Sequence, residues 1–252
     1  MASIASDSQS GGAEKEQVIR EVAFPEGLSS AQSLAIDAAG RLWFTEKVGK
    51  KITVFDPEKN TFKSHALPAS WGKMGFSRFA MSPDGDIWFT LTRWVEGGEE
   101  PHMLGRYSPA DGYFTKYNLS INILPKEIIV DAAGVVWFTS SNKNSLYRVD
   151  PKNFNLKGYA IPAKNSYQSG LASDGEGNIW FSEPNANTLV KFVPVKHVFY
   201  EYPVPTPFAN PGDISIDSNG NVWFVQTSAN RLGLFYPESQ RFDEAIIPTS
   251  NS

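Results

Sequence analysis

A tandem repeat of about 43 residues constrains the fold of this chain more than any other feature. Five copies share a D-x-x-G turn and a following Trp-Phe pair, and their tryptophans lie 43 to 49 residues apart: Trp43, Trp88, Trp137, Trp180 and Trp223. An Asp stands six residues before the Trp in four copies, and Ser82 replaces it in the second. In such a turn an Asp side chain can accept hydrogen bonds from backbone amides, and Gly adopts positive φ easily. A repeat of this length indicates a solenoid, a propeller or an array.

Each copy contains four short strand patterns. An apolar strand precedes the turn, a second strand carries the Trp-Phe pair, a third ends at a proline, and a fourth follows, such as FKSHALP or FYEYPVP. Proline ends a strand because it has no N–H to donate to the ladder. No segment has the periodicity of an amphipathic helix over two turns. We therefore predict an all-β fold, a β-propeller of four-stranded antiparallel blades, with the Trp-Phe pairs packed between neighbouring blades.

An extra segment precedes the five copies. Residues 18–25, VIREVAFP, match the pattern of the fourth strand. This N-terminal strand either closes the ring by pairing with the final blade or belongs to a partial sixth blade. We predict a propeller domain over residues 18–250. Residues 1–17 are small, polar and aperiodic and lack the basic start and apolar core of a signal peptide, so we predict a disordered tail there.

Composition excludes several classes of protein. The net charge of -4 and the pI near 5.5 argue against a nucleic-acid binder, which usually has a basic patch. No stretch approaches the roughly 20 apolar residues of a membrane-spanning helix, which predicts a soluble protein. The chain has no cysteine, which excludes disulfides, thiolate nucleophiles and Cys-based zinc sites but identifies no compartment. An exported or cell-surface protein would need a signal outside this sequence. The oligomeric state is left open.

The repeat resembles a known family of propellers. The pattern D-x-x-G-x-(I/L/V)-W-F-(T/S)-E, followed by N-x-(I/L)-x-x-(F/V), is similar to the streptogramin B lyase (virginiamycin B lyase) family over residues 18–248, and NHL-type domains look alike at this level. The resemblance implies a magnesium-dependent carbon–oxygen lyase that opens a cyclic depsipeptide at its ester linkage by proton abstraction and elimination. In that family, histidines in a P-H-G motif lie eleven residues before the Trp of two blades, and a glutamate lies three residues after a Trp.

The family's positions can be read in this chain one by one. Eleven residues before each Trp stand Gln32, Ser77, Lys126, Ser169 and Gly212, none of them histidine. Glu46 and Glu183 keep the carboxylate three residues after the Trp, and the resemblance makes them the candidates for a magnesium site. A general base must titrate near the working pH, which suits His best. Lys126 would serve only if burial lowered its pKa by several units. We therefore predict a divergent member without the catalytic histidines.

Two sets of loops share one face of a propeller: those that enter the first strand of each blade and those that join its second and third strands. Function concentrates on loops, so we expect a binding site on this loop face. In the second copy the Trp-to-Pro distance is 21 residues, against 14 in the others, so an insertion extends over this loop face. Aromatic and charged side chains favour interfaces. The second copy supplies these candidates: Trp71, Lys73, Arg78, Arg93, Trp94, Glu96 and His102. The other copies add polar groups that converge if the ring closes: Lys126, Glu127, Tyr167, Gln168, Asp213 and Gln226. His65, in an outer strand, is expected to face solvent.

Three functions compete on this reading. The first is a non-catalytic propeller that binds a protein or a small-molecule ligand on the loop face. The second is an enzyme, either a lyase or a metal-dependent hydrolase with its metal in the central funnel. The third is a structural module of a larger surface or sensor assembly. The missing histidines favour the first over the second.

Overall fold

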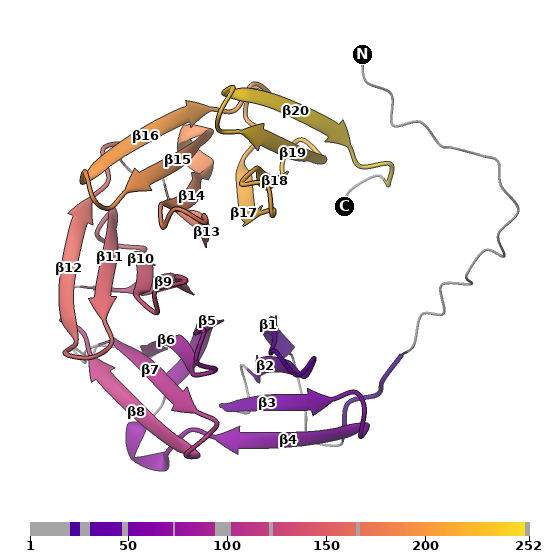
Figure 1. The fold of residues 1–252 in the computed structure, drawn as a ribbon, viewed down its shortest axis with the longest axis vertical. Coiled ribbons are helices and arrows are strands. Elements are labelled where there is room, and N and C mark those ends of the chain that lie inside the picture. The colour runs from indigo at the N-terminus through magenta and orange to yellow at the C-terminus, as the bar shows by residue number, and fades with distance from the viewer. Residues whose placement is uncertain are drawn as a thin grey trace, which may run out of the picture.

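The computed structural model describes residues 21–25, 31–46, 50–72, 74–93, 102–120, 123–164 and 167–249, with only the backbone at residue 93. These residues form five four-stranded antiparallel sheets, which confirms the predicted propeller. The sheets stand as blades around a common axis, and the first strand of each blade lies nearest that axis (Figure 1). No helix in the described residues is long and apolar enough to cross a membrane.

Each blade runs from its inner to its outer strand in chain order. Blade 1 comprises β1 (Ala31–Ile36), β2 (Leu42–Glu46), β3 (Lys51–Asp56) and β4 (Thr61–Ala66). Blade 2 comprises β5 (Met74–Met81), β6 (Ile87–Arg93), β7 (Met103–Ser108) and β8 (Tyr113–Asn118). Blade 3 comprises β9 (Pro125–Val130), β10 (Val136–Ser140), β11 (Ser145–Asp150) and β12 (Asn155–Ala160). Blade 4 comprises β13 (Ser169–Ser173), β14 (Ile179–Glu183), β15 (Thr188–Val193) and β16 (Val198–Pro203). Blade 5 comprises β17 (Pro211–Ile216), β18 (Val222–Gln226), β19 (Arg231–Tyr236) and β20 (Arg241–Ile246). Two short 3-10 helices, η1 (Ala69–Trp71) and η2 (Pro184–Ala186), lie in connections.

The D-x-x-G turn joins the first and second strands of a blade, and its Asp and Gly take the roles predicted for them. In blade 3 the amide of Gly134 donates to the carbonyl of Asp131 at 2.9 Å, and Gly134 has φ of 78°. One carboxylate oxygen of Asp131 accepts the amides of Ala133 and Val135, at 3.0 and 2.9 Å. The turn is therefore closed by its own side chain, as predicted.

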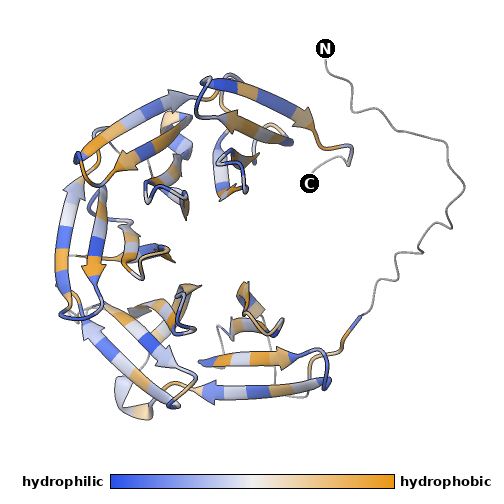
Figure 2. Ribbon diagram, viewed as in Figure 1, coloured by the Kyte–Doolittle hydropathy of each residue, from blue (hydrophilic) through white to orange (hydrophobic). Residues whose placement is uncertain are grey.

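Apolar side chains fill the spaces between neighbouring blades. Four clusters of buried residues join blades 1 to 2, 2 to 3, 3 to 4 and 4 to 5. Each cluster contains the Trp of one blade and the Phe of the next, such as Trp180 with Phe224. The outer strands mix hydrophilic with hydrophobic residues, because only part of each outer strand packs inward (Figure 2). The cores of this propeller thus lie between blades.

The ring has an opening between blade 5 and blade 1 (Figure 1). Trp223 of blade 5 is 36% exposed, and Leu34 of blade 1 is 65% exposed. Among the described residues no buried apolar cluster joins these two blades. The sequence left the closure of the ring undecided, and in this structure the last and first blades do not pack as the others do.

The inner strands approach one another closely near the loop face. All five pairings of first and second strands contain a register shift, such as that between Phe76 and Phe79 in β5. Hydroxyl groups that follow the Trp-Phe pair bridge neighbouring blades. Thr90 Oγ1 donates to the carbonyl of Lys126 at 3.1 Å, and Ser182 Oγ donates to that of Gly212 at 2.7 Å. Such irregular inner strands redirect side chains toward the axis.

Candidate functional site

A network of charged side chains crosses from β5 to β9 on the inner strands. Arg78 Nε donates to Glu127 Oε2 at 3.0 Å, and Lys126 Nζ lies 3.8 Å from Glu127 Oε1. The Glu127 side chain is 8% exposed, so the two cations flank a nearly buried carboxylate. The charge of Glu127, aided by its hydrogen bond and by more distant Asp213 and Tyr167, raises the pKa of Arg78 despite its partial burial. The sequence predicted these residues to converge, and the structure brings them together.

Lys126 extends from this network to the start of blade 4. Its Nζ donates to the carbonyl of Gln168 at 2.7 Å and lies 3.7 Å from the ring centroid of Tyr167. Tyr167 is 52% exposed and has φ of 56°. A bulky residue with positive φ is uncommon, and such backbone strain tends to cluster at functional sites. Lys126 therefore holds an exposed aromatic ring at the start of blade 4.

A pocket of about 470 Å³ opens next to Tyr167 between blades 3 and 4. Its lining contains the amide side chains of Asn142, Asn144, Gln168 and Asn185. Gln168 Nε2 donates to Asn144 Oδ1 at 2.8 Å, and Asn144 Nδ2 donates to the carbonyl of Ala163 at 2.6 Å. Asn144 also donates to the carbonyl of Ile161, so its side chain is bonded within the chain and holds the wall in place. Amide groups as a class can both donate to and accept from the amide or ester groups of a ligand.

The pocket was only partly predictable. The sequence marked Tyr167, Gln168 and Lys126, but the role of Asn144 in this wall was missed. Asn144 has φ of 43°, a left-handed conformation that Asn tolerates in turns. Its side chain also orients Gln168. The signal was present in the asparagines of the second-to-third loops of blades 3 and 4, but sequence could not show that the two loops face one pocket.

The two carboxylates proposed for magnesium lie apart in this fold. Glu46 ends β2 in blade 1 and Glu183 ends β14 in blade 4, and both are fully buried. Glu46 Oε1 accepts a 2.5 Å hydrogen bond from Thr53 of its own blade. Across the described segments no group of three or more His, Cys, Asp or Glu side chains is placed to hold a metal ion. The pair therefore stands in two different blades, and a magnesium site on either carboxylate stays a prediction.

Gln226 and Asp213 belong to blade 5. Gln226 is buried, and its Nε2 donates to Glu244 Oε1 at 2.7 Å, so it faces the interior of its blade. Asp213 lies on β17 and is exposed. Its charge contributes to the raised pKa of Arg78. Of these two candidates, Asp213 adds its charge to the network around Arg78, whereas Gln226 forms its hydrogen bond within its own blade.

Much of the insertion in the second copy cannot be placed. Lys73, Trp94 and Glu96 lie outside the described residues, as does the side chain of Arg93. Trp71 was expected on the loop face, but its side chain is 7% exposed and packs edge-on against Phe114 at 6.1 Å. The 3-10 turn of η1 directs the indole into the core between blades 1 and 2.

Two histidines are partly buried. His65 does not face solvent as expected, because its ring stacks on Trp43 at 6.2 Å and its Nδ1 lies 2.7 Å from the hydroxyl of Tyr107 in blade 2. Burial, with a smaller effect of the Lys63 charge, lowers the pKa of His65. Burial also lowers the pKa of His102. The outer strand β4 directs the His65 side chain onto blade 2. The alternating pattern of a strand therefore underestimates the burial of His65.

The fold and the site define a β-propeller with an amide-lined pocket and a charged network on its loop face. The chain belongs to the virginiamycin B lyase family, whose model matches residues 17–252. A comparison with curated protein sequences gave no match.

Three solved structures place this fold among its relatives. A catalytically inactive variant of virginiamycin B lyase from Staphylococcus aureus with quinupristin is 24% identical, with a TM-score of 0.78 over 92% of this chain and 75% of that one. A streptogramin B lyase is 27% identical, with a TM-score of 0.74 over 88% of this chain and 70% of that one. YCF48 bound to D1 peptide is 12% identical, with a TM-score of 0.65 over 88% of this chain and 68% of that one. The first of these structures contains quinupristin and the third contains the D1 peptide.

Proposed function

We propose that this propeller binds a peptide or depsipeptide ligand on its loop face and does not cleave it. The observation that carries the proposal is the position of Tyr167, an exposed ring held by Lys126 beside a pocket of four amide side chains. An aromatic ring supplies apolar contact area, and amides supply paired donors and acceptors. The family match and the ligands of two of the solved relatives support this class of ligand.

The charged network supports recognition rather than proton abstraction. At the position where the resemblance implies a histidine, Lys126 donates to a carbonyl and lies beside the Glu127 carboxylate. Both contacts suit an ammonium group, which is a hydrogen-bond donor only. A general base needs a free lone pair directed at substrate. Lys126 and Arg78 are better suited to hold a carbonyl or carboxylate of the ligand.

A titration with quinupristin, followed by isothermal calorimetry, tests the proposal. We expect saturable binding to the wild-type chain and at least tenfold weaker binding by Tyr167→Ala, since about 1.4 kcal/mol corresponds to a factor of ten. Tyr113→Ala is the matched control, because Tyr113 is also an exposed tyrosine but lies on the outer strand β8. It should bind as the wild type does.

The same mixtures, separated by chromatography after long incubation with magnesium, report on catalysis. We expect quinupristin to stay cyclic. Accumulation of a linear product would show that the chain is a lyase, and equal binding by Tyr167→Ala and wild type would remove the pocket from the site. Absence of binding up to millimolar quinupristin would overturn the depsipeptide ligand.

A further inference from the structure

An aromatic side chain on the loop face projects into solvent. Phe208 lies in the loop that enters blade 5, between β16 and β17, and is 90% exposed. Its φ is 53°, in the left-handed region that a bulky residue seldom adopts. An exposed apolar ring forgoes the stabilisation of burial, and backbone strain of this kind tends to cluster at functional sites. The packing of blade 5 therefore does not account for the position of this ring.

The loops that enter blades 2 and 3 bury the residue at the equivalent position. In each of these loops the first residue donates its amide to the carbonyl of the residue just before a third strand: Leu67, Leu119 and Val204. Four positions later stand Trp71, Ile123 and Phe208. Trp71 and Ile123 are 7% and 8% exposed and belong to the apolar clusters between blades. In the loop of blade 5 the next residue, Ala209, is the buried one. This loop thus places a small side chain in the core and turns the large one outward.

Hydrogen bonds hold the loop on both sides of Phe208. Asn187, which ends η2 in blade 4, donates through Nδ2 to the carbonyl of Thr206 at 3.0 Å and accepts the amide of Ala209 at 2.9 Å. Thr206 Oγ1 donates to Glu244 Oε2 of blade 5 at 2.7 Å. The backbone that carries Phe208 is therefore fixed between blades 4 and 5. A ring on such a fixed turn is ordered before a ligand arrives, which lowers the entropy cost of binding.

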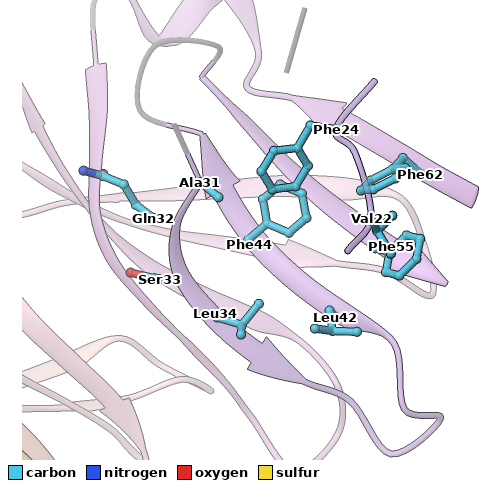
Figure 3. A pocket seen from close by; sticks show the side chains of 10 residues that line it. All are labelled: Val22, Phe24, Ala31, Gln32, Ser33, Leu34, Leu42, Phe44, Phe55 and Phe62. Carbon is cyan, nitrogen blue, oxygen red and sulfur yellow. The ribbon is translucent and has the colours of Figure 1, made fainter. Parts of the chain in front are cut away.

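Two other exposed rings have packing partners, in contrast to Phe208. Phe24 is 50% exposed, yet it packs on Phe44 and Phe62 at 5.5 and 6.0 Å in an apolar pocket at the edge of blade 1 (Figure 3). The ring of Tyr167 has a lysine ammonium against it. Within the described residues neither a ring nor a cation lies against Phe208. Its ring is therefore open to a ligand.

Phe208 and the pocket beside Tyr167 lie on the same loop face, because Phe208 and Tyr167 both belong to loops that enter first strands. The short helix η2 stands between them. Its Asn185 lines the pocket, and Asn187 at its end bonds the loop of Phe208. Neighbouring packed sheets lie about 10 Å apart, and an extended chain rises about 3.3 Å per residue. A ligand that contacts both rings must therefore span about three extended residues.

We propose that Phe208 is a second aromatic contact of the ligand site, which receives an apolar or aromatic side chain of the peptide or depsipeptide bound beside Tyr167. This inference rests on the function proposed above and sets a minimum size for its ligand. One ligand molecule crosses η2 and covers both rings, so amino acids and dipeptides are too short to make both contacts. The amide wall recognises polar groups of the ligand backbone, and the two separated rings select its side chains.

Calorimetric titration with quinupristin tests the contact with two variants of Phe208. Phe208→Asn removes the ring but keeps a residue that tolerates positive φ, whereas Phe208→Tyr keeps an aromatic ring. We expect Phe208→Asn to bind about tenfold more weakly than the wild type or worse, and Phe208→Tyr to bind as the wild type does. Val195→Asn is the matched control, because Val195 is 89% exposed but lies in the turn between β15 and β16, on the opposite face. It should leave binding unchanged, and the stoichiometry should be one quinupristin per chain.

The outcomes separate this inference from the function on which it rests. Weaker binding by both Phe208→Asn and Tyr167→Ala supports the two proposals together. Weaker binding by Tyr167→Ala alone overturns the contact at Phe208 and leaves the pocket in place. Weaker binding by Phe208→Asn alone supports the contact and removes the pocket. Two quinupristin molecules per chain overturn the single spanning ligand, and no binding by the wild type overturns both proposals.

Thermal unfolding guards against a structural role of the ring. Phe208→Asn should melt at the same temperature as the wild type or above it, because the ring has no packing to lose and Asn tolerates the left-handed backbone better. A clearly lower melting temperature would show that the ring packs on the protein in solution, which overturns its role as a ligand contact.

Discussion

The indole Nε1 of Trp180 donates a 2.9 Å hydrogen bond to Asp174 Oδ2, six residues earlier in the chain. The other carboxylate oxygen of Asp174 accepts the amides of Glu176 and Asn178 in the turn. Burial acts to raise the pKa of Asp174, but these bonds and nearby Lys191 outweigh it and hold that pKa below its ordinary value. The repeat tryptophans of blades 1, 3 and 5 donate the same bond to Asp37, Asp131 and Asp217. One Asp side chain therefore closes the turn and orients the indole that packs against the next blade.

Replacement of Asp174 by alanine should lower the free energy of unfolding by about 2–3 kcal/mol, because the buried indole N–H and two turn amides lose their acceptor. Urea unfolding at pH 7 measures it. Asp217→Ala is the control, since Trp223 is partly exposed and water can replace the carboxylate there. Equal losses in the two variants would show that the indole bond adds nothing to the turn.

His65→Tyr should flatten the pH dependence of stability. Burial lowers the pKa of His65 below its ordinary value near 6.5, so the neutral ring stabilises the fold above that pH and the contribution is lost as the pH falls below it. Tyr117, Tyr159 and Tyr202 hold this position in blades 2 to 4. Unfolding at pH 7.5 and pH 5.5 should show a smaller difference for the variant than for the wild type. His102 titrates in the same direction in both proteins and cancels in the comparison.

Trp180→Ala should lower the free energy of unfolding by roughly 3–5 kcal/mol, as expected for deletion of a large core side chain. Trp223→Ala should lower the free energy of unfolding by less than about 2 kcal/mol, because the Trp223 indole is only partly removed from water. Thermal and urea unfolding of the two variants provide the comparison. A Trp223 variant as unstable as the Trp180 variant would mean that the indole is covered in solution.

Gly170→Ala tests the close approach of the inner strands of blades 4 and 5. Gly170 has φ of 53°, and an added Cβ would lie 2.6 Å from the backbone nitrogen of Ile214. Gly177→Ala is the matched control, with φ of 78° and no atom within 4 Å of the added Cβ. The control should lose about 1–2 kcal/mol from the left-handed backbone alone. The Gly170 variant should lose about 1–3 kcal/mol more from the steric overlap. Similar losses would rule out the contact as a constraint.

The repeat predicted the blades well because local chemistry sets their boundaries. Strand β3 ends at Asp56, directly before Pro57, and β15 ends at Val193, directly before Pro194. The convergence of Lys126, Glu127 and Tyr167 was predicted because all three lie in segments that enter the first strands of neighbouring blades, on one face of the propeller. The burial of Trp71 and His65 did not follow, because each lies where the connection or outer strand of one blade leans on the next.

By itself the sequence determined the blade, since the Asp turn, the Trp-Phe pair and the closing proline act within one copy of the repeat. Only the tertiary structure decided which repeat tryptophan stays partly exposed and which loops share the pocket beside Tyr167. Those relationships join residues of different blades, and they depend on how far the packed blades turn about the axis, a quantity that no single copy encodes.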